Sequence, residues 1–156
     1  LGFPNNTYTQ EGIAVLTEYL SGHLTIKRLK EIALRVIAID MMINGLDFKS
    51  LYHELVNTYY LNKDDAFILS TRIFRGGGFT KDHLYLKGFI RILKHYKEGK
   101  SLDALLIGKN SIAYLDVFEE MIARKLAKPP KYITNILKNP KKCSPQVNYV
   151  ISGLLN

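Results

Sequence analysis

Apolar side chains recur every three or four positions along most of the chain, the spacing that places them on one face of an α-helix. The pattern is strongest between Leu24 and Asn44, where the apolar positions are Ile26, Leu29, Ile32, Ala33, Val36, Ile37 and Met41. The polar positions between them are Lys27, Arg28, Lys30 and Glu31. This segment therefore predicts an amphipathic helix that ends at Asn44-Gly45.

The same spacing predicts further helices before and after this segment. Their expected ranges are 7–21, 48–60, 63–74, 81–97, 101–107 and 113–126. Thr7 and Gln10 have the spacing of a capping box at the start of the first range. Asp47 and Thr80 are the expected caps of the helices at 48–60 and 81–97. Because no stretch alternates like a strand, the predicted fold class is all-α, a multi-helical domain of about seven helices.

Two proline-containing stretches, Lys128-Pro129-Pro130-Lys131 and Asn139-Pro140-Lys141-Lys142, interrupt the helical pattern near the end. Only short helical segments, at 132–137 and 147–155, fit between and after them. We therefore expect a helical domain over 1–127 and a Pro/Lys-rich tail over 128–156 that docks on it. The apolar residues available for docking are Tyr149, Val150, Leu154 and Leu155.

Composition limits the class of protein and its partners. The chain has 156 residues, the length of one folded domain. Its composition, 47% hydrophobic and 23% charged, excludes general disorder. Its formal net charge of +8 suits an acidic partner such as a nucleic acid or an acidic peptide. The longest apolar run, 33–43, contains Arg35 and Asp40 and is too short to span a bilayer, so no membrane partner is expected. The single cysteine, Cys143, favours a reducing, cytoplasmic compartment.

The first predicted helix opens with the run Thr9-Gln10-Glu11-Gly12-Ile13-Ala14. This run resembles the Gln-Glu-Gly-Leu-Ala motif of a family of bacterial proteins described as flavohemoglobin expression-modulating, which also includes eukaryotic tyrosine carboxypeptidases that act on tubulin. Ile13 replaces the usual leucine. The resemblance continues through the Arg-Gly-Gly and Phe-Thr-Lys-Asp segments at 75–82, and through Tyr85 and Gly88.

The resemblance implies a gluzincin-like metallopeptidase in which Glu11 is the third zinc ligand. The other two ligands would be histidines of a His-Glu-x-x-x-His helix, and this sequence contains no such string. None of the four histidines has a short ligand spacing: His23, His53, His83 and His95. We therefore expect the C-terminal part of such a protein, which binds zinc weakly or not at all and is inactive by itself.

Glu11 and Gln10 also have ordinary interpretations. A glutamate at a helix start stabilises the positive end of the helix dipole without any ligand. As a zinc ligand, Glu11 would complete the familiar set of two histidines and one glutamate. Gln10 would contact the substrate, or it would serve only as the capping-box partner of Thr7.

A second candidate site surrounds the glycines at 76–78. Arg72 and Arg75 lie three residues apart, on one side of a predicted helix, and Lys81 opens the next helix. Together with the free N–H groups of that helix start, these cations would hold a carboxylate such as the C-terminus of a peptide. The alternative is a glycine-capped helix end whose arginines face water. Tyr85, one turn further on, would donate to an oxyanion, or it would pack as an ordinary buried aromatic.

Two functions follow from these patterns. The first is a zinc-dependent carboxypeptidase that acts on the C-terminus of a peptide or protein. The alternative is a basic, all-helical binding or regulatory module for nucleic acid or an acidic protein partner. Nucleic acid is the less favoured partner, because the chain contains no recognised nucleic-acid motif and no aromatic residues interleaved with the basic ones.

Overall fold

The computed structural model of the protein describes residues 4–75 and 81–155, and within these ranges it is helical without any strand. This confirms the predicted all-α class. The α-helices are α1 (Asn6–Leu20), α2 (Ile26–Ile43), α3 (Phe48–Asn57), α4 (Lys63–Phe74), α5 (Leu84–Lys97), α6 (Leu115–Ala123), α7 (Asn135–Lys138) and α8 (Pro145–Gly153). Three 3-10 turns are η1 (Lys81–His83), η2 (Asp103–Leu106) and η3 (Ile112–Tyr114). The glycine run and the expected cap Thr80 lie outside the described residues.

Contacts divide the chain into two compact units. The first comprises Leu1–Leu29 with Leu84–Asn156, and the second is Lys30–His83. The tail at 128–156 groups with the first unit, and α2 begins in the first unit and continues through the second. None of the helices in the described ranges combines the length and apolar character needed to cross a bilayer.

Local capping signals predicted one helix start and misplaced another. The side chain of Asp47 accepts a hydrogen bond of 2.7 Å from the Ser50 N–H, as expected for the cap of α3. The capping box at Thr7 was wrong. Helix α1 starts after Asn5, which adopts a left-handed conformation (φ 60°) that asparagine tolerates, so Thr7 already lies inside the helix. Glu11 consequently lies in the second turn of α1, not the first.

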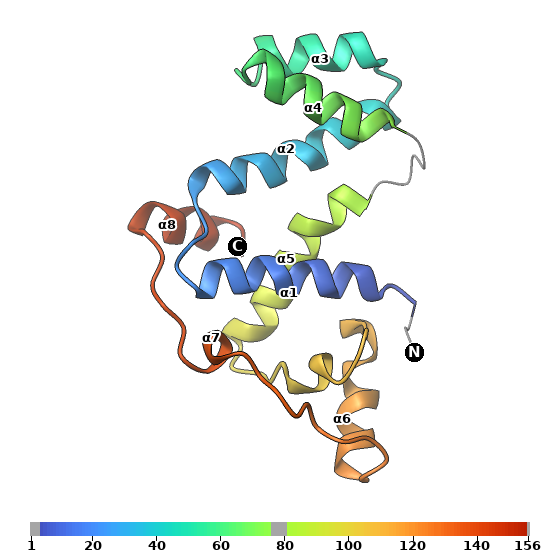
Figure 1. Cartoon of the computed structure of the whole chain (residues 1–156), viewed down its shortest axis with the longest axis vertical. Helices are drawn as coiled ribbons and strands as arrows, with labels where there is room; N and C mark the ends of the chain where they lie inside the picture. Colours follow the sequence, from blue (N-terminus) through green and yellow to red (C-terminus); the bar gives the residue numbers. More distant parts are fainter. Residues whose placement is uncertain (1–3, 76–80, 156) are drawn as a thin grey trace. The chain divides into compact units, whose positions relative to one another are not determined.

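In the first unit, α1 and α5 pack across each other (Figure 1). Their contact faces carry the apolar residues that the helical periodicity selects, and all are buried: Val15, Leu16 and Tyr19 from α1, and Phe89, Ile92 and Leu93 from α5. The rings of Tyr19 and Phe89 meet edge to face, with centroids 6.2 Å apart. This helix pair is the scaffold of the unit.

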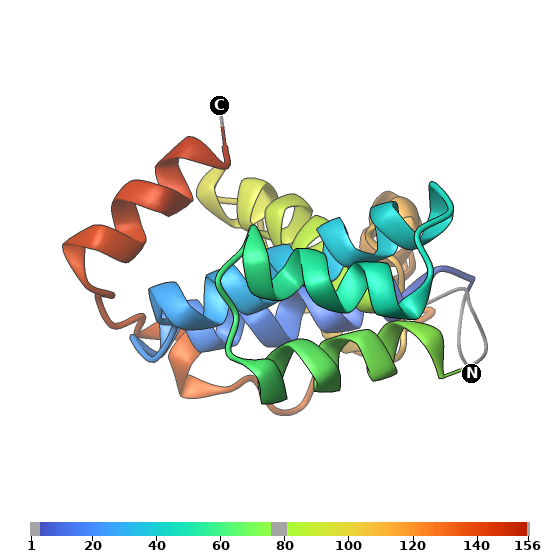
Figure 2. The same ribbon diagram turned by 90° about the horizontal axis from the view of Figure 1, so that it is seen from above.

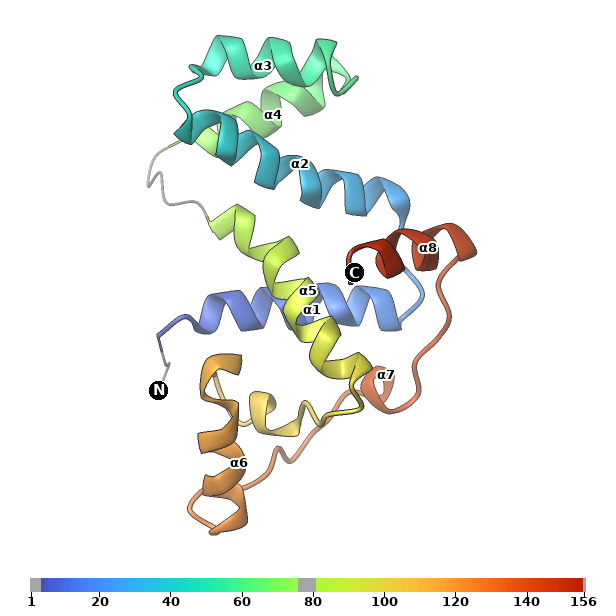
Figure 3. The ribbon, with the colours of Figure 1, turned by 180° about the vertical axis from the view of Figure 1, so that it is seen from behind.

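The tail is held on the C-terminal end of α1 by backbone and side-chain bonds. The Lys141 N–H donates to the Leu20 carbonyl at 2.7 Å, and the Tyr19 hydroxyl donates to Asn148 Oδ1 at 2.9 Å. The Cys143 thiol donates to the Tyr19 carbonyl at 3.1 Å. Figure 3 shows the tail passing α7 before α8.

The face of α8 that packs inward differs from the one predicted. Val147 and Ile151 are buried. Of the four predicted docking residues, Tyr149 is 83% exposed and Val150 is 39% exposed, whereas Leu154 and Leu155 are half-buried. Residues four apart share one helix face, and the helix begins at Pro145, after the cap Ser144, which fixes the face that Val147 presents.

Burial of Cys143 and Tyr19 makes the stability of the first unit sensitive to alkaline pH. Burial raises the pKa of the Cys143 thiol, and it raises the pKa of the Tyr19 hydroxyl, with a further rise from the neighbouring Cys143. Both groups therefore stay protonated to a higher pH in the folded chain than in the unfolded one. The two protonated groups contribute fully to the free energy of unfolding below the pKa of the thiol in the unfolded chain, about 8.5. This contribution is lost as the pH rises above that value.

We accordingly expect the free energy of unfolding, measured with urea, to fall between pH 7.5 and 9.5. Cys143→Ala should flatten this decline, because the variant has no thiol to ionise. If the variant shows the same slope as the parent chain, ionisation of Cys143 is not the cause.

The second unit has its own apolar core, built from α2, α3 and α4. Figure 2 shows α3 and α4 running side by side. The buried residues between the three helices are Leu34, Ala38, Ile39, Leu51, Leu55, Ala66, Leu69 and Ile73. Helix α4 has the bounds that the periodicity predicted, 63–74, and the side chain of Asn62 caps it by accepting from the Asp65 N–H.

Candidate functional site

The residues predicted for the site are divided between the two units, so each group is described within its own unit. Gln10, Glu11 and Tyr85 belong to the first unit, and Arg72, Arg75 and Lys81 belong to the second.

In the first unit, α1 and α5 approach most closely at two glycines. A Cβ atom on Gly12 would lie 2.5 Å from the carbonyl carbon and oxygen of Gly88, and one on Gly88 would overlap the carbonyl oxygen of Tyr8. Real Cβ atoms do not come so close to backbone, so the two helices touch through their main chains. The crossing therefore requires glycine at both positions.

This crossing brings Glu11 and Tyr85 to the same junction. Glu11 directly precedes Gly12, and Tyr85 lies three residues, about one helical turn, before Gly88. Both side chains are half-buried, as is Gln10. Each of these residues therefore lies within about one helical turn of the crossing along its own helix.

Two further bonds fix the first turn of α1. The Tyr8 hydroxyl donates to the Lys87 carbonyl at 2.8 Å. Thr9, which is fully buried, accepts a bond of 2.9 Å from the Ile112 N–H through its hydroxyl oxygen. Both residues lie just before Glu11, so the backbone that carries this carboxylate is held from two sides. Sequence reasoning did not assign these roles, because both bonds join segments distant in the chain.

The other end of α1 is fixed by an ion pair. Arg28 donates from Nε and Nη2 to the two carboxylate oxygens of Glu18, each at 3.0 Å. Such a two-pronged contact is geometrically specific. Glu18 therefore holds α1 against the segment that leads into α2.

The described residues do not form a zinc site by themselves. Within 4–75 and 81–155, no three side chains among histidine, cysteine, aspartate and glutamate converge as metal ligands. A three-ligand zinc site that includes Glu11 therefore needs at least one ligand from outside the described part of the chain.

In the second unit, Arg72 contacts a buried aspartate. Its Nε and Nη2 atoms each lie 2.7 Å from Oδ1 of Asp82, and Nη1 of Arg35 lies 3.7 Å from the same oxygen. Asp82 is only 5% exposed. Two nitrogens of the Arg72 guanidinium are thus engaged by a protein carboxylate, which leaves fewer for a substrate.

Arg75 and Lys81 stand at the two ends of the glycine run. Arg75 ends α4, with its N–H donating to the Thr71 carbonyl at 2.9 Å, and its side chain is exposed. Lys81 opens η1. Because residues 76–80 lie outside the described ranges, the predicted anion site at this turn stays a prediction.

Asp82 was the residue of this region that sequence reasoning missed. The sequence does contain a pattern that indicates its ion pair with Arg72. An arginine lies in the last helical turn before the glycines, and an aspartate follows them. Opposite charges on either side of a glycine-rich stretch can meet, because glycine allows the chain to turn back.

Comparison with known proteins identifies a family for the chain. No curated protein and no solved structure matches the chain. A family described as microtubule-associated tyrosine carboxypeptidase matches residues 1–154. The matched range includes Gly12 and Gly88 as well as Arg72 and Asp82. The chain therefore belongs to the microtubule-associated tyrosine carboxypeptidase family.

Proposed function

We propose that the chain forms part of a zinc-dependent carboxypeptidase that acts on the C-terminus of a peptide or protein, with Glu11 as one zinc ligand. The observation that carries the proposal is the position of Glu11 beside Gly12, where the main chains of α1 and α5 touch. Membership in a family of tyrosine carboxypeptidases supplies the reaction class.

The local geometry suits a metal ligand. A ligand has to be held within a fraction of an ångström, and a helix anchored on both sides of the ligand achieves this better than a loop. Helix α1 is anchored by Tyr8 and Thr9 before Glu11 and by the glycine contact after it. The dipole interpretation has lost support, because the dipole acts mainly within the first turn and Glu11 lies in the second. Bound zinc would polarise the scissile carbonyl and lower the pKa of a coordinated water.

The remaining predicted residues have roles in holding the substrate. A carboxypeptidase must recognise a free carboxylate, for which guanidinium and ammonium groups are suited. We assign this role to Arg75 and Lys81 rather than to Arg72, because two nitrogens of Arg72 already contact Asp82. Tyr85 would donate its hydroxyl to the oxyanion of the tetrahedral intermediate, and Gln10 would contact the peptide. The free thiol of Cys143 fits a reducing cytoplasm.

The first test is zinc binding by the isolated chain, measured by calorimetry. If the remaining ligands lie outside the chain, we expect no stoichiometric binding at submicromolar affinity, because one carboxylate alone is a weak ligand. Tight binding of one zinc ion per chain would contradict the proposal that the site is shared with residues outside it.

The second test is Glu11→Gln in a longer polypeptide that contains this chain together with the remaining ligands. We expect zinc content to fall at least about tenfold, and release of the C-terminal residue to be lost with it. Glu120→Gln is the matched control, because Glu120 is an exposed acid on α6. A Glu11→Gln protein that keeps its full zinc content would remove Glu11 from the ligand set.

A further inference from the structure

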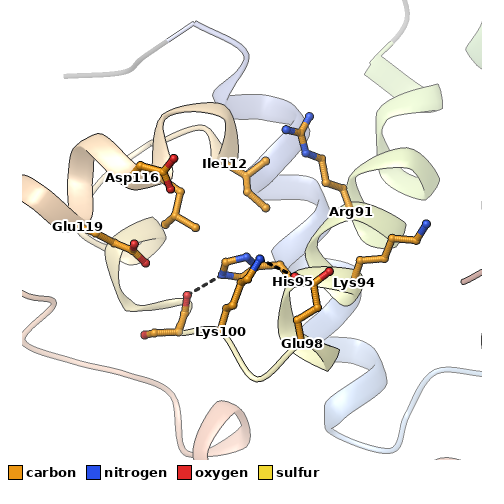
Figure 4. Close-up of a pocket in the computed structure, with 10 residues that line it drawn as sticks. Arg91, Lys94, His95, Glu98, Lys100, Ile112, Asp116 and Glu119 are labelled. Carbon is orange, nitrogen blue, oxygen red and sulfur yellow. Dashed lines mark hydrogen bonds and ion pairs between the residues drawn. The ribbon is translucent and has the colours of Figure 1, made fainter.

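A pocket in the first unit lies between α5 and α6, apart from the residues assigned to the site above. It is an open depression of about 530 Å³ with exposed charged side chains, lined by α5, the turn that follows it, η3 and the first turns of α6 (Figure 4). This volume falls within the range of small-molecule sites in proteins, about 300–1,000 Å³. The pocket is therefore large enough for a ligand of a few hundred daltons.

The two walls of the pocket carry opposite charges. Arg91 and Lys94 project from α5 on one side, and Asp116 and Glu119 project from α6 on the other (Figure 4). Within the part of the chain that the structure describes, none of these four side chains forms a hydrogen bond or ion pair with the protein. The walls are thus too far apart to neutralise each other by direct contact.

An ion pair lies at the floor of the pocket. The ammonium of Lys100 lies 2.6 Å from the Glu98 carboxylate, and this hydrogen bond lowers the pKa of Glu98 and raises the pKa of Lys100. The buried ring of His95 donates from Nε2 to the Ser101 carbonyl at 2.8 Å. Lys94 further lowers the pKa of Glu98. Asp116 and Glu119 further raise the pKa of Lys100, so the wall charges interact with this pair through space. The wall side chains keep their own hydrogen-bonding groups available for a ligand.

Apolar surface lies between the charged walls. Ile112 of η3 is half-buried and Leu115 of α6 is buried, and both line the pocket. A ligand that fits must therefore offer an anionic group, an apolar middle and a cationic group in that order. An inorganic phosphate would be repelled by the acidic wall, and a divalent cation by the basic wall.

We propose that this pocket binds a short peptide with free termini. Arg91 and Lys94 hold its C-terminal carboxylate, Asp116 and Glu119 hold its N-terminal ammonium, and an apolar side chain rests on Ile112. A peptide of two or three residues reaches about 7–10 Å when extended, which suits charges held apart by an apolar surface. The proposal does not rest on the hydrolase function, because it uses no metal and none of the residues assigned to that site.

The test is a titration of the ¹⁵N-labelled chain with the dipeptide leucyl-leucine, followed by amide chemical shifts. We expect saturable shifts in residues 91–101 and 112–119. The same dipeptide with an acetylated N-terminus and an amidated C-terminus should bind at least about tenfold more weakly, because each charge-assisted contact contributes to affinity. Arg91→Gln and Glu119→Gln should each weaken binding of the free dipeptide several-fold.

Lys138→Gln, at an exposed lysine of α7 outside the pocket, is the matched control and should bind like the parent chain. Glu11→Gln should also bind normally, which separates this inference from the zinc proposal. Equal binding of the free and blocked dipeptides would overturn the proposal. So would the absence of saturation up to about 10 mM, an affinity too weak for a formed site.

Discussion

Gly88→Ala is expected to destabilise the first unit by about 3 kcal/mol or more, the upper range for overpacking a close-packed interior. The added methyl group would overlap the Tyr8 carbonyl oxygen and would lie 3.1 Å from the Gly12 nitrogen. These neighbours are main-chain atoms, which cannot change rotamer to make room. Relief requires α1 and α5 to separate, and that separation would loosen the Tyr19–Phe89 contact and the rest of the buried face.

Urea unfolding of Gly88→Ala, followed by circular dichroism, measures this effect. Gly153→Ala is the matched control, because Gly153 also lies in a helix and a Cβ there would meet no atom within 4 Å. The control should change the free energy of unfolding by no more than about 0.5 kcal/mol. If the two variants unfold at the same urea concentration, the glycines do not set the crossing.

The same substitution has a consequence for the site. Glu11 and Tyr85 flank the glycine contact, so a variant that separates the helices displaces both side chains together. If the longer polypeptide proposed above binds zinc through Glu11, Gly88→Ala should lower its zinc content even though glycine offers no ligand. The circular dichroism spectrum of the variant must first show that it is folded. Only then can a loss of zinc be attributed to displacement of Glu11.

Local features of the fold could be read from the sequence. Apolar periodicity predicted the bounds of α4, and Asp47 predicted the start of α3. Both predictions succeeded because these features depend on residues within one or two helical turns. The start of α1 was missed by the capping-box rule, since Asn5 begins the helix by a backbone conformation without a side-chain bond. The docking face of α8 was also misread, because apolar residues occur on more than one face of this short helix.

Features that join distant segments could not be read in the same way. Gly12 was recognised as a place where another backbone could pass, but its partner Gly88 lies 76 residues away along the chain. The contact between Arg72 and Asp82 and the two walls of the α5–α6 pocket likewise depend on how helices return to each other. Residue type limits what such sites can do, whereas tertiary packing decides which residues meet.

The buried ion pair of the second unit gives the other large expected effect. Arg72→Met should destabilise this unit by about 3 kcal/mol, because it leaves the buried Asp82 carboxylate without its nearest partner. Arg35, 3.7 Å away, compensates only in part. Thermal or urea unfolding of the variant measures the loss. Arg124→Met is the control, since the Arg124–Glu120 pair is exposed and pairs of that kind contribute about 0–1 kcal/mol.

A double variant separates the structural role of Arg72 from a role in binding substrate. Replacing both partners, as in Arg72→Met with Asp82→Leu, removes the buried charge as well as its partner and should recover much of the lost stability. The test uses a polypeptide that contains this chain and shows the proposed carboxypeptidase activity. If Arg72 serves the fold alone, the double variant there keeps its KM for a peptide substrate. If Arg72 also binds the substrate carboxylate, KM rises although the fold is restored. Because two Arg72 nitrogens already contact Asp82, we expect the first result, with Arg75→Gln raising KM instead.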